Sequence, residues 1–397
     1  VLGNHEFALR LIPFISGCLC LILILLLSDK LSITPISKWY ILLIFALSPL
    51  AIRYATEFKQ YSTDTFITLV FIYLGVKDKN APINNRFIFK WALLGAFMLW
   101  LSMPIVFILA GIGLSFVYLQ RKSNKNLLSL ALVFSAWLSS FLVYYFTILN
   151  TDIQSDYLRN YHSQYFFDFL PSNKEELIGS YKLLISVFRS VTDKTTLSII
   201  LAAGTFIIGT YHLFKSDKFK LILFTVPILS LFIASSLQLY SLIPRLSLFI
   251  IPLFLFIIGI GISKLWNYPY PIIKLILWVL ILLSIINKQG YQYFYEPMKF
   301  EESRPVLTYL QERRDEEDLI FVHHDAKAAF NYYNSHHINP FQFTNYYLAG
   351  WEESNGNAIN NSIKEKTLTE FWLFISHTFP PQKVDNIIKT VQMQYTM

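Results

Sequence analysis

The sequence predicts an α-helical polytopic membrane protein with about ten transmembrane helices, followed by a small α/β domain at the carboxyl end. The 397 residues are 54% hydrophobic and only 15% charged, with a mean hydropathy of +0.45, which is too apolar for an ordinary soluble domain. Apolar runs recur along residues 1–287, and a polar tail in which helix and strand patterns alternate follows them.

Several apolar runs reach the ~20 residues that a helix needs to cross a bilayer, and the shorter ones can be tilted or extended by their flanks. The sequence Ser102-Met103-Pro104 divides residues 87–119 into two helices, because proline interrupts a helix. If each run is one crossing, the chain has ten spans. The runs cover residues 7–28, 39–52, 62–76, 87–101, 103–119, 127–149, 197–214, 219–237, 246–263 and 270–286.

Basic residues orient the predicted spans. The connecting segments 29–38, 77–90, 120–126, 212–220 and 264–274 carry fourteen Lys and Arg residues but only three acids. By the positive-inside rule, these segments face the cytoplasm. The alternate segments then face outward, and they are residues 1–6, 53–61, 150–196, 238–245 and everything after 287.

The tail predicts a small extracytoplasmic α/β domain. Its helix and strand patterns alternate, which is typical of this class of domain. We therefore divide the chain into a transmembrane domain at residues 1–287 and an α/β domain at residues 288–397. The predicted elements are a helix at Arg304–Arg314, a strand at Asp318–His323, a helix at Ala326–Tyr333, a strand at Thr369–Ile375 and a helix at Gln382–Val391.

Composition and spacing disfavour several kinds of site. The net charge of +7 forms no basic face with interleaved aromatic residues, so nucleic acid is not a predicted partner. Cys18 and Cys20 point to different sides of the first helix, which argues against a disulfide between them. Two histidine-rich segments could suggest a metal site, and they are His323–Asp325 and His336–His337. We interpret both as surface clusters, because neighbouring side chains at a strand end point to opposite faces.

The junction between the second and third apolar runs holds the main candidate site, with charged residues at Arg53, Glu57, Lys59 and Asp64. A charge near a bilayer is costly unless it faces water, a cavity or a partner. One interpretation is a salt-bridged helix flank that reaches the interface. The other is an outward-facing site, in which Asp64 or Glu57 accepts a proton or a hydroxyl hydrogen bond and Lys59 or Arg53 holds a phosphate. Glu57, Tyr61 and Asp64 share one face if the segment is helical.

Motifs in a fixed order along the chain resemble those of a known family. They are the opening segment Asn4–Phe14, the junction Ser48–Tyr61, the sequence Ser102–Phe107, and the loop Leu239–Arg245 followed by Pro252. Their order, sidedness and spacing resemble the polytopic glycosyltransferases that use lipid-linked sugars and have the GT-C fold. This family includes the protein O-mannosyltransferases and the aminoarabinose transferase of lipid A. Tail segments Arg304–Leu307 and Asp318–Val322 resemble the extracytoplasmic domain of its bacterial members.

The resemblance implies roles for individual residues. Asp64 and Glu57 would support catalysis, and the substrate would contact Arg53, Lys59, Tyr61, Arg245, Tyr240 and Glu6. Arg245 is either an interfacial anchor or a phosphate clamp, because a guanidinium binds two phosphate oxygens in a fork. The segment with Asp152, Asp156, Tyr161 and His162 is either a solvated loop or part of a sugar or acceptor site.

In that family the principal catalytic Asp lies in the first outward loop, ahead of the residues that match the start of this sequence. We therefore expect the chain to be a fragment that lacks this Asp and an N-terminal segment. No cleavable signal peptide is recognised, since few basic residues and no small-residue cleavage site accompany the first apolar run.

The predicted function is an inverting glycosyltransferase that moves a sugar from a polyprenyl-phosphate carrier to a lipid, glycan or protein acceptor. It would act on the outer face of the bacterial cytoplasmic membrane, among membrane lipids. No cofactor is predicted, and the use of a divalent metal is left open. The rival is a transporter or flippase for a lipid-linked sugar or another envelope precursor. Transporters typically have charged residues in the middle of their spans, or interrupted helices at corresponding positions of two similar halves. In this sequence the charged residues lie at the ends of the spans.

Overall fold

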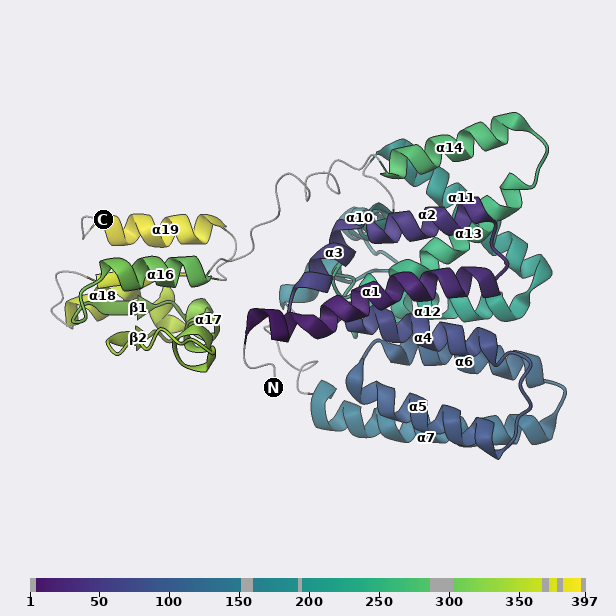
Figure 1. Cartoon of the computed structure of the whole chain (residues 1–397), viewed down its shortest axis with the longest axis horizontal. Coiled ribbons are helices and arrows are strands. Elements are labelled where there is room, and N and C mark those ends of the chain that lie inside the picture. The colour runs from purple at the N-terminus through teal and green to yellow at the C-terminus, as the bar shows by residue number, and fades with distance from the viewer. Residues whose placement is uncertain are drawn as a thin grey trace. The chain divides into compact units, whose positions relative to one another are not determined.

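The structure is a computed structural model that describes residues 5–150, 160–191, 195–285, 303–365, 371–376 and 381–393 (Figure 1). The chain forms two compact units. One runs from Arg10 to Glu296, and the other combines Val1–Leu9 with Pro297–Met397. The predicted domain boundary at residues 287 and 288 falls outside the described residues.

The first unit is a bundle of helices, and each of the ten predicted apolar runs forms helix. Helices satisfy their own backbone groups, which hydrocarbon surroundings require. Cys18 and Cys20 are free thiols, one exposed and one buried, as predicted. The helices are α1 (Glu6–Lys30), α2 (Pro35–Ala46), α3 (Pro49–Thr56), α4 (Tyr61–Lys77), α5 (Asn85–Leu101), α6 (Ile105–Gln120), α7 (Asn124–Tyr144), α10 (Lys174–Val191), α11 (Thr196–Ser216), α12 (Lys218–Ser236), α13 (Ile251–Trp266) and α14 (Pro271–Ile285).

The chain is a helical membrane protein, but the prediction of ten spans is wrong. Five of the described helices are long and apolar enough to cross a membrane, or six if the bent pair α2–α3 counts as one span. The reason is length, because α4 and α5 have 17 residues each, α6 has 16 and α14 has 15. At ~1.5 Å per residue, 17 residues cover ~25 Å, less than the ~30 Å of a hydrocarbon core.

Capping residues and proline account for the breaks between short helices. Ser48 accepts a hydrogen bond from the Ala51 N–H, and Pro49 occupies the first turn of α3, so α2 and α3 meet at 52°. At the predicted Ser102–Pro104 break, α5 ends at Leu101 and α6 begins at Ile105. Both breaks therefore have a local cause in the sequence.

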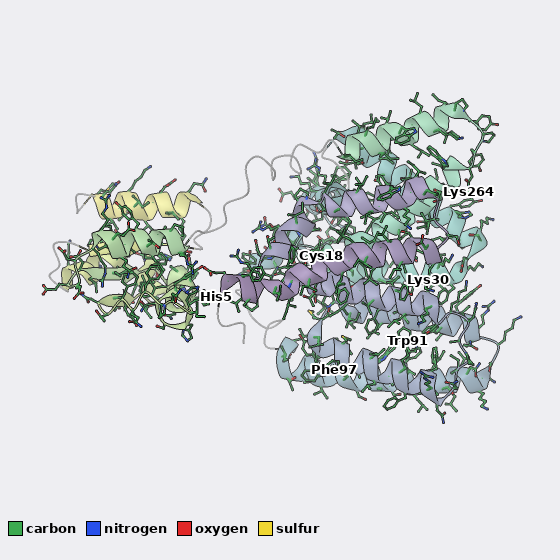
Figure 2. All side chains as sticks on the ribbon, viewed as in Figure 1. His5, Cys18, Lys30, Trp91, Phe97 and Lys264 are labelled. Carbon is green, nitrogen blue, oxygen red and sulfur yellow. The ribbon has the colours of Figure 1, made fainter. Side chains whose placement is uncertain are left out.

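The basic connecting segments gather at one end of the bundle. Lys79 and Asp217, from the α4–α5 and α11–α12 connections, form an ion pair of 2.9 Å. Figure 2 shows Lys30 and Lys264 at this same end. The alternation of sides along the chain thus agrees with the charge pattern, while the assignment of this end to the cytoplasm stays a prediction.

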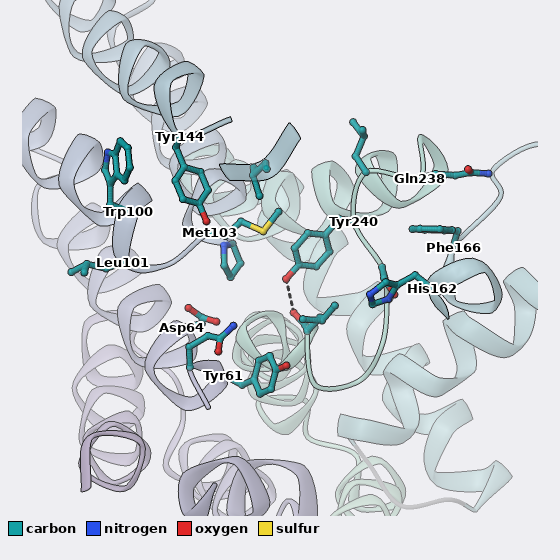
Figure 3. Close-up of a pocket in the computed structure, with 16 residues that line it drawn as sticks. Tyr61, Asp64, Trp100, Leu101, Met103, Tyr144, His162, Phe166, Gln238 and Tyr240 are labelled. Carbon is teal, nitrogen blue, oxygen red and sulfur yellow. Dashed lines mark hydrogen bonds between the residues drawn. The ribbon is translucent and has the colours of Figure 1, made fainter. Parts of the chain in front are cut away.

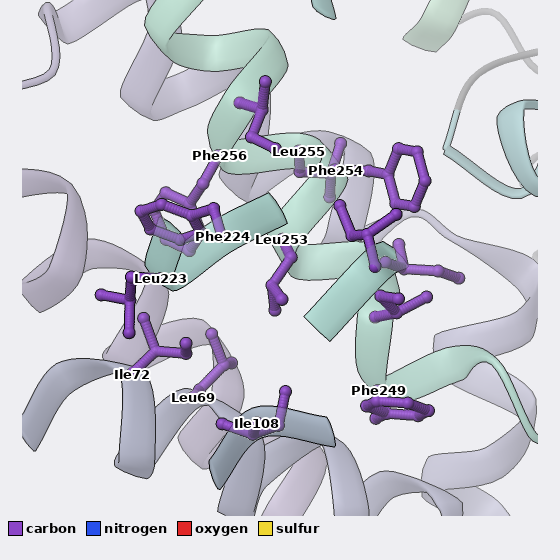
Figure 4. Packing of buried hydrophobic residues seen from close by; sticks show 14 of the residues in the cluster. Leu69, Ile72, Ile108, Leu223, Phe224, Phe249, Leu253, Phe254, Leu255 and Phe256 are labelled. Atoms are coloured by element: carbon purple, nitrogen blue, oxygen red, sulfur yellow. The ribbon is translucent and has the colours of Figure 1, made fainter. Parts of the chain in front are cut away.

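Helix α13 forms the centre of the bundle. Its side chains are buried from Ile251 to Ile262, as expected for a helix that is apolar all round. Phe256 packs on Phe224 of α12, with ring centroids 5.9 Å apart, and Figure 4 shows the surrounding aliphatic side chains. Phe254 stacks on Phe206 of α11, with ring centroids 5.1 Å apart.

Two glycines let α11 and α13 approach closely. A Cβ atom at Gly261 would lie 2.0 Å from the Thr205 carbonyl oxygen, and one at Gly209 would lie 2.1 Å from the Ile257 carbonyl oxygen. Only glycine fits either position, because the backbones themselves are in contact. Small residues commonly make such approaches between membrane helices.

The second unit is built on a three-stranded parallel sheet with strand order β2–β1–β3. In β1 (Leu319–Val322), Ile320 pairs with Tyr346 of β2 (Tyr346–Leu348) and with Trp372 of β3 (Phe371–Phe374). Ile320 and Val322 pack under α16 (Ser303–Arg313) and α17 (Lys327–Asn331), whereas Phe321 packs under α18 (Gly356–Glu365) and α19 (Pro381–Gln392). Helices therefore cover both faces of the sheet.

The predicted elements of this unit are present, and two further elements were not predicted. These are β2 and α18, which follow one another in the chain. The predicted helix at Ala326–Tyr333 is split, with an α-helix at Lys327–Asn331 and a π-helical turn at Tyr332–His336.

The prediction of surface histidine clusters is wrong for His323 and His337, which are 1% and 4% exposed. His323 Nε2 lies 2.9 Å from the Ser354 carbonyl oxygen, and its Nδ1 accepts the Asp325 N–H at 3.2 Å. These bonds satisfy the buried ring and identify the neutral Nε2–H tautomer.

Gly261→Ala is expected to destabilise the bundle, because the added Cβ would overlap the Thr205 carbonyl oxygen. Overpacking of this kind costs about 1–3 kcal/mol. Gly204→Ala in α11 is the matched control, since a Cβ there meets nothing within 4 Å. Thermal unfolding of the solubilised full chain measures both variants. Equal midpoints for the two would contradict the close approach.

Stability of the second unit is expected to fall in mild acid. Burial lowers the pKa of His323, so the unfolded chain binds this proton more readily. The contribution is complete above about pH 6.5 and is lost as the pH drops from there toward the folded pKa. Amide exchange of β1 in the full chain, followed between about pH 7.5 and 5.5, measures this loss. His323→Gln should flatten the profile, and an unchanged profile in that variant would assign the effect to other groups.

Candidate functional site

A cavity of about 470 Å³ lies at the end of the bundle opposite the basic connections (Figure 3). Its walls are helix ends and breaks: the start of α4, the α5–α6 break, the end of α7, and the connection from α12 to α13. The lining residues are Gln60, Tyr61, Asp64, Trp100, Leu101, Met103, Pro104, Tyr144, Leu149, His162, Phe166, Gln238, Leu239, Tyr240, Ser241 and Leu246.

Asp64 is the acidic residue of this lining. It lies in the first turn of α4, where an acidic side chain is favoured by the helix dipole. The residue is 5% exposed, and its Oδ1 has no hydrogen-bond partner among the described residues. The Ser102 hydroxyl at the α5–α6 break is buried beside this carboxyl and is its hydrogen-bonding neighbour. A polar ligand that donates hydrogen bonds would offset the cost of burying this carboxylate.

Two tyrosines flank Asp64. Tyr240 donates its hydroxyl hydrogen to the Leu246 carbonyl oxygen at 2.9 Å (Figure 3). This bond links two residues of the connection between α12 and α13. Burial, reinforced by the charge of Asp64, raises the pKa of Tyr240 well above its usual range, so its hydroxyl remains protonated. The ring of Tyr61 meets that of Tyr54 edge to face, with centroids 4.8 Å apart. Both lining tyrosines are therefore held in place.

Arg245 and His162 form a basic pair at the edge of the cavity. Arg245 Nη2 donates to the Tyr161 hydroxyl at 3.2 Å, and its buried Nε has no partner in the described part of the chain. His162 lines the cavity with a buried Nδ1 that also lacks a partner there. Burial, followed by the charge of Arg245, lowers the pKa of His162, so the imidazole is neutral at pH 7. Of these two residues, Arg245 carries the positive charge, and its Nε–H can donate a hydrogen bond to a ligand.

Unpaired buried polar atoms concentrate at this cavity. Across the described ranges, eight buried side-chain N or O atoms lack a partner by geometry; two of them belong to the lining residues Asp64 and His162, and two more belong to Ser102 and Arg245, which adjoin lining residues in the chain. Folded proteins pair nearly all such atoms, so a group of exceptions in one place calls for a ligand or water. This concentration makes the cavity the candidate functional site.

The predicted cluster from Arg53 to Asp64 divides between two environments. Glu57, Tyr61 and Asp64 would share one face only in a continuous helix, and this condition is not met, because α3 ends at Thr56 and α4 begins at Tyr61. Arg53 and Glu57 form an ion pair of 2.7 Å, as the salt-bridged interpretation proposed. Lys59 is exposed and, like that pair, is absent from the cavity lining. Of the candidate residues in this cluster, Tyr61 and Asp64 line the cavity, and Gln60 between Lys59 and Tyr61 lines it with them.

Glu6 belongs to a different group of side chains. It lies in the second unit, where its Oε2 is 3.2 Å from His337 Nε2 and 3.4 Å from Arg304 Nη2. It does not line the cavity. The predicted candidates Asp152 and Asp156 lie outside the described residues.

Sequence reasoning named Tyr61, Tyr240 and His162, which line the cavity, but it missed Trp100, Tyr144 and Phe166. Trp100 and Tyr144 meet edge to face at 5.5 Å, beside the α5–α6 break that the sequence predicted. That break was the available signal, because a helix interruption exposes the side chains next to it. In the described ranges, no group of three or more His, Cys, Asp or Glu residues has the geometry of a metal site.

Asp64→Asn is expected to raise the thermal unfolding midpoint of the full chain, because the amide removes a carboxyl group whose charged form is disfavoured by burial. Asp78→Asn is the matched control at the opposite end, where Asp78 accepts hydrogen bonds from Lys90 and Trp91. Breaking these bonds should lower stability by about 1–3 kcal/mol. A loss of stability in both variants would contradict the unpaired state of Asp64.

No family model matches the chain, and no curated protein matches its sequence. The resemblance to the GT-C glycosyltransferases therefore rests on the motifs of the sequence alone.

Proposed function

We propose that the protein is a glycosyltransferase that moves a sugar from a polyprenyl-phosphate carrier to a hydroxyl acceptor on the outer face of the membrane. The observation that carries this proposal is the cavity at one end of the bundle: its lining includes the buried Asp64, whose Oδ1 is unpaired, and Arg245, which precedes the lining residue Leu246, has an unpaired guanidinium nitrogen. A sugar phosphate has hydroxyl donors for the first group and anionic oxygens for the second.

The cavity has separate surfaces for the two parts of such a substrate. Asp64 accepts hydrogen bonds from a sugar or acceptor hydroxyl. Arg245 binds the phosphate, with His162 and the hydroxyl of Tyr61 as neutral neighbours. Trp100 and Tyr144 supply aromatic surface that suits the apolar face of a sugar ring.

An apolar groove of about 280 Å³ between α5, α6 and α7 supports a lipid-linked substrate. It includes Leu99, Val106 and Phe141, which lie within a few residues of the cavity-lining Trp100, Pro104 and Tyr144. A substrate with a polar head and a long hydrocarbon tail would fit a polar cavity that adjoins an apolar groove.

The reaction is a displacement at the anomeric carbon. The acceptor oxygen forms a bond to this carbon as the bond to the phosphate oxygen breaks, and the electron pair leaves with the lipid phosphate. The acceptor proton passes to a carboxylate, and Arg245 stabilises the charge that grows on the phosphate. Asp64 positions the reacting hydroxyl groups in this scheme, and the identity of the general base is left open.

The orientation follows from charge. The basic end of the bundle faces the cytoplasm, which leaves the cavity and the second unit on the outer, periplasmic side of the bacterial inner membrane. A lipid-linked donor suits this side, because the lipid tail remains in the bilayer while the sugar phosphate enters the cavity.

Sugar transfer by the full chain in lipid nanodiscs, with polyprenyl-phosphate sugars as donors, tests the proposal. Asp64→Asn and Arg245→Ala are each expected to lower kcat/KM by about 10–100-fold, the effect of losing one charge-assisted hydrogen bond. Asp29→Asn and Arg121→Ala, on the basic connections, are the matched controls and should retain activity. Full activity in both cavity variants would remove the cavity from the reaction.

A second arm tests the lipid tail. Ala110→Phe fills the groove and should weaken donor binding, whereas Ala131→Phe on the exposed face of α7 should not. A chain that binds no polyprenyl-phosphate sugar is not this transferase. Movement of the intact lipid-linked sugar across a proteoliposome bilayer, without transfer, would instead establish the transporter.

A further inference from the structure

The second unit carries a separate group of polar and aromatic side chains where its parallel strands end. Strand β1 lies between β2 and β3, and the helices that follow β1 and β2 cover opposite faces of the sheet. The chain therefore changes direction at β1. In open parallel sheets, ligands bind outside the carboxyl ends of the strands at such a point.

Three segments meet at this edge. His324 and Asp325 come directly after β1, Trp351 follows β2, and Lys383 lies in the first turn of α19 after β3. The rings of His324 and Trp351 meet edge to face, with centroids 5.2 Å apart. Lys383 Nζ lies 5.2 Å from the centroid of the Trp351 ring. One aromatic surface, one carboxylate, one imidazole and one ammonium group therefore lie close together.

The loop that carries Trp351 is held rigidly against β1. Ser354 accepts the His324 N–H on its hydroxyl oxygen at 2.9 Å, and its carbonyl oxygen accepts from the buried His323 ring. The Glu353 carboxylate accepts the Gly350 N–H at 2.6 Å. Despite these bonds, Trp351 itself is 57% exposed. A fixed and uncovered indole is a common anchor for a ligand.

We propose that these four residues, His324, Asp325, Trp351 and Lys383, form a strand-end site that binds a neutral pyranose ring of a glycan. The indole offers a flat apolar surface to the C–H face of the sugar. Asp325 accepts hydrogen bonds from ring hydroxyls, and Lys383 donates them. The carboxylates of Asp325 and of Glu353 in the neighbouring loop outnumber the one ammonium group, which disfavours an anionic ligand such as a phosphate. The site is independent of the proposed transfer reaction.

Saturation-transfer NMR on the full chain in nanodiscs tests the strand-end site, with neutral trisaccharides of glucose, mannose and N-acetylglucosamine as probes. At least one should receive saturation on its ring protons. Trp351→Ala should weaken its binding about tenfold or more. Asp325→Asn should weaken binding while leaving the indole in place. Tyr309→Ala removes an equally exposed aromatic ring from α16 of the same unit, and it should bind as the wild type does.

Three results would overturn the proposal. One is a lack of saturation on all three trisaccharides. Another is unchanged binding in Trp351→Ala, provided that its thermal unfolding matches the wild type. The third is quenching by brominated lipids that Trp351→Phe abolishes, because the indole would then lie in the bilayer rather than in a glycan site.

Discussion

The contact between the backbones of α11 and α13 fixes the position of the cavity. Gly209 and Gly261 remove the side chains that would hold these helices apart, which keeps α13 at the centre of the bundle. The connection into α13 carries Tyr240 and Arg245, and the short helix at its end packs on α4. The first turn of α4 carries Asp64. The packing of this short helix on α4 therefore sets how far Arg245 lies from Asp64.

Interrupted helices give this end of the bundle its polar character. A helix that spans the hydrocarbon satisfies its own backbone and presents apolar side chains, and it leaves no place for a buried charge. The break at Ser102–Pro104 shortens helices that would otherwise continue through this region, and Leu101, Met103 and Pro104 beside it line the cavity. The cavity lies beyond the ends of these shortened helices, where polar side chains can line it. The same feature that reduces the number of full-length spans therefore creates the candidate site.

The sequence predicted the helices of the bundle because apolar runs and proline breaks are local signals. It overestimated the spans because the length of an apolar run does not tell where the helix within it ends. For the site, Asp64, Tyr61, Tyr240 and Arg245 were named from motifs, and three of these line the cavity. Glu57 was named with Asp64 from the charged junction and the resemblance, and the helix break between α3 and α4 separates it from the cavity. Trp100 and Tyr144 were missed, since their role comes from contacts between distant segments.

The pairing of acidic residues distinguishes the two ends of the bundle. At the basic end, Asp29, Asp78 and Asp217 each form an ion pair with a lysine, and these pairs tie neighbouring connections together. At the opposite end, Asp64 is more deeply buried than any of them and has an unpaired oxygen. Burial without pairing opposes folding, so stability alone does not account for an acid there. A sequence that pairs its acids at one end and leaves a buried acid unpaired at the other is arranged for a ligand at the second end. This contrast holds whichever substrate enters the cavity, and it is the strongest physical reason to place the function there.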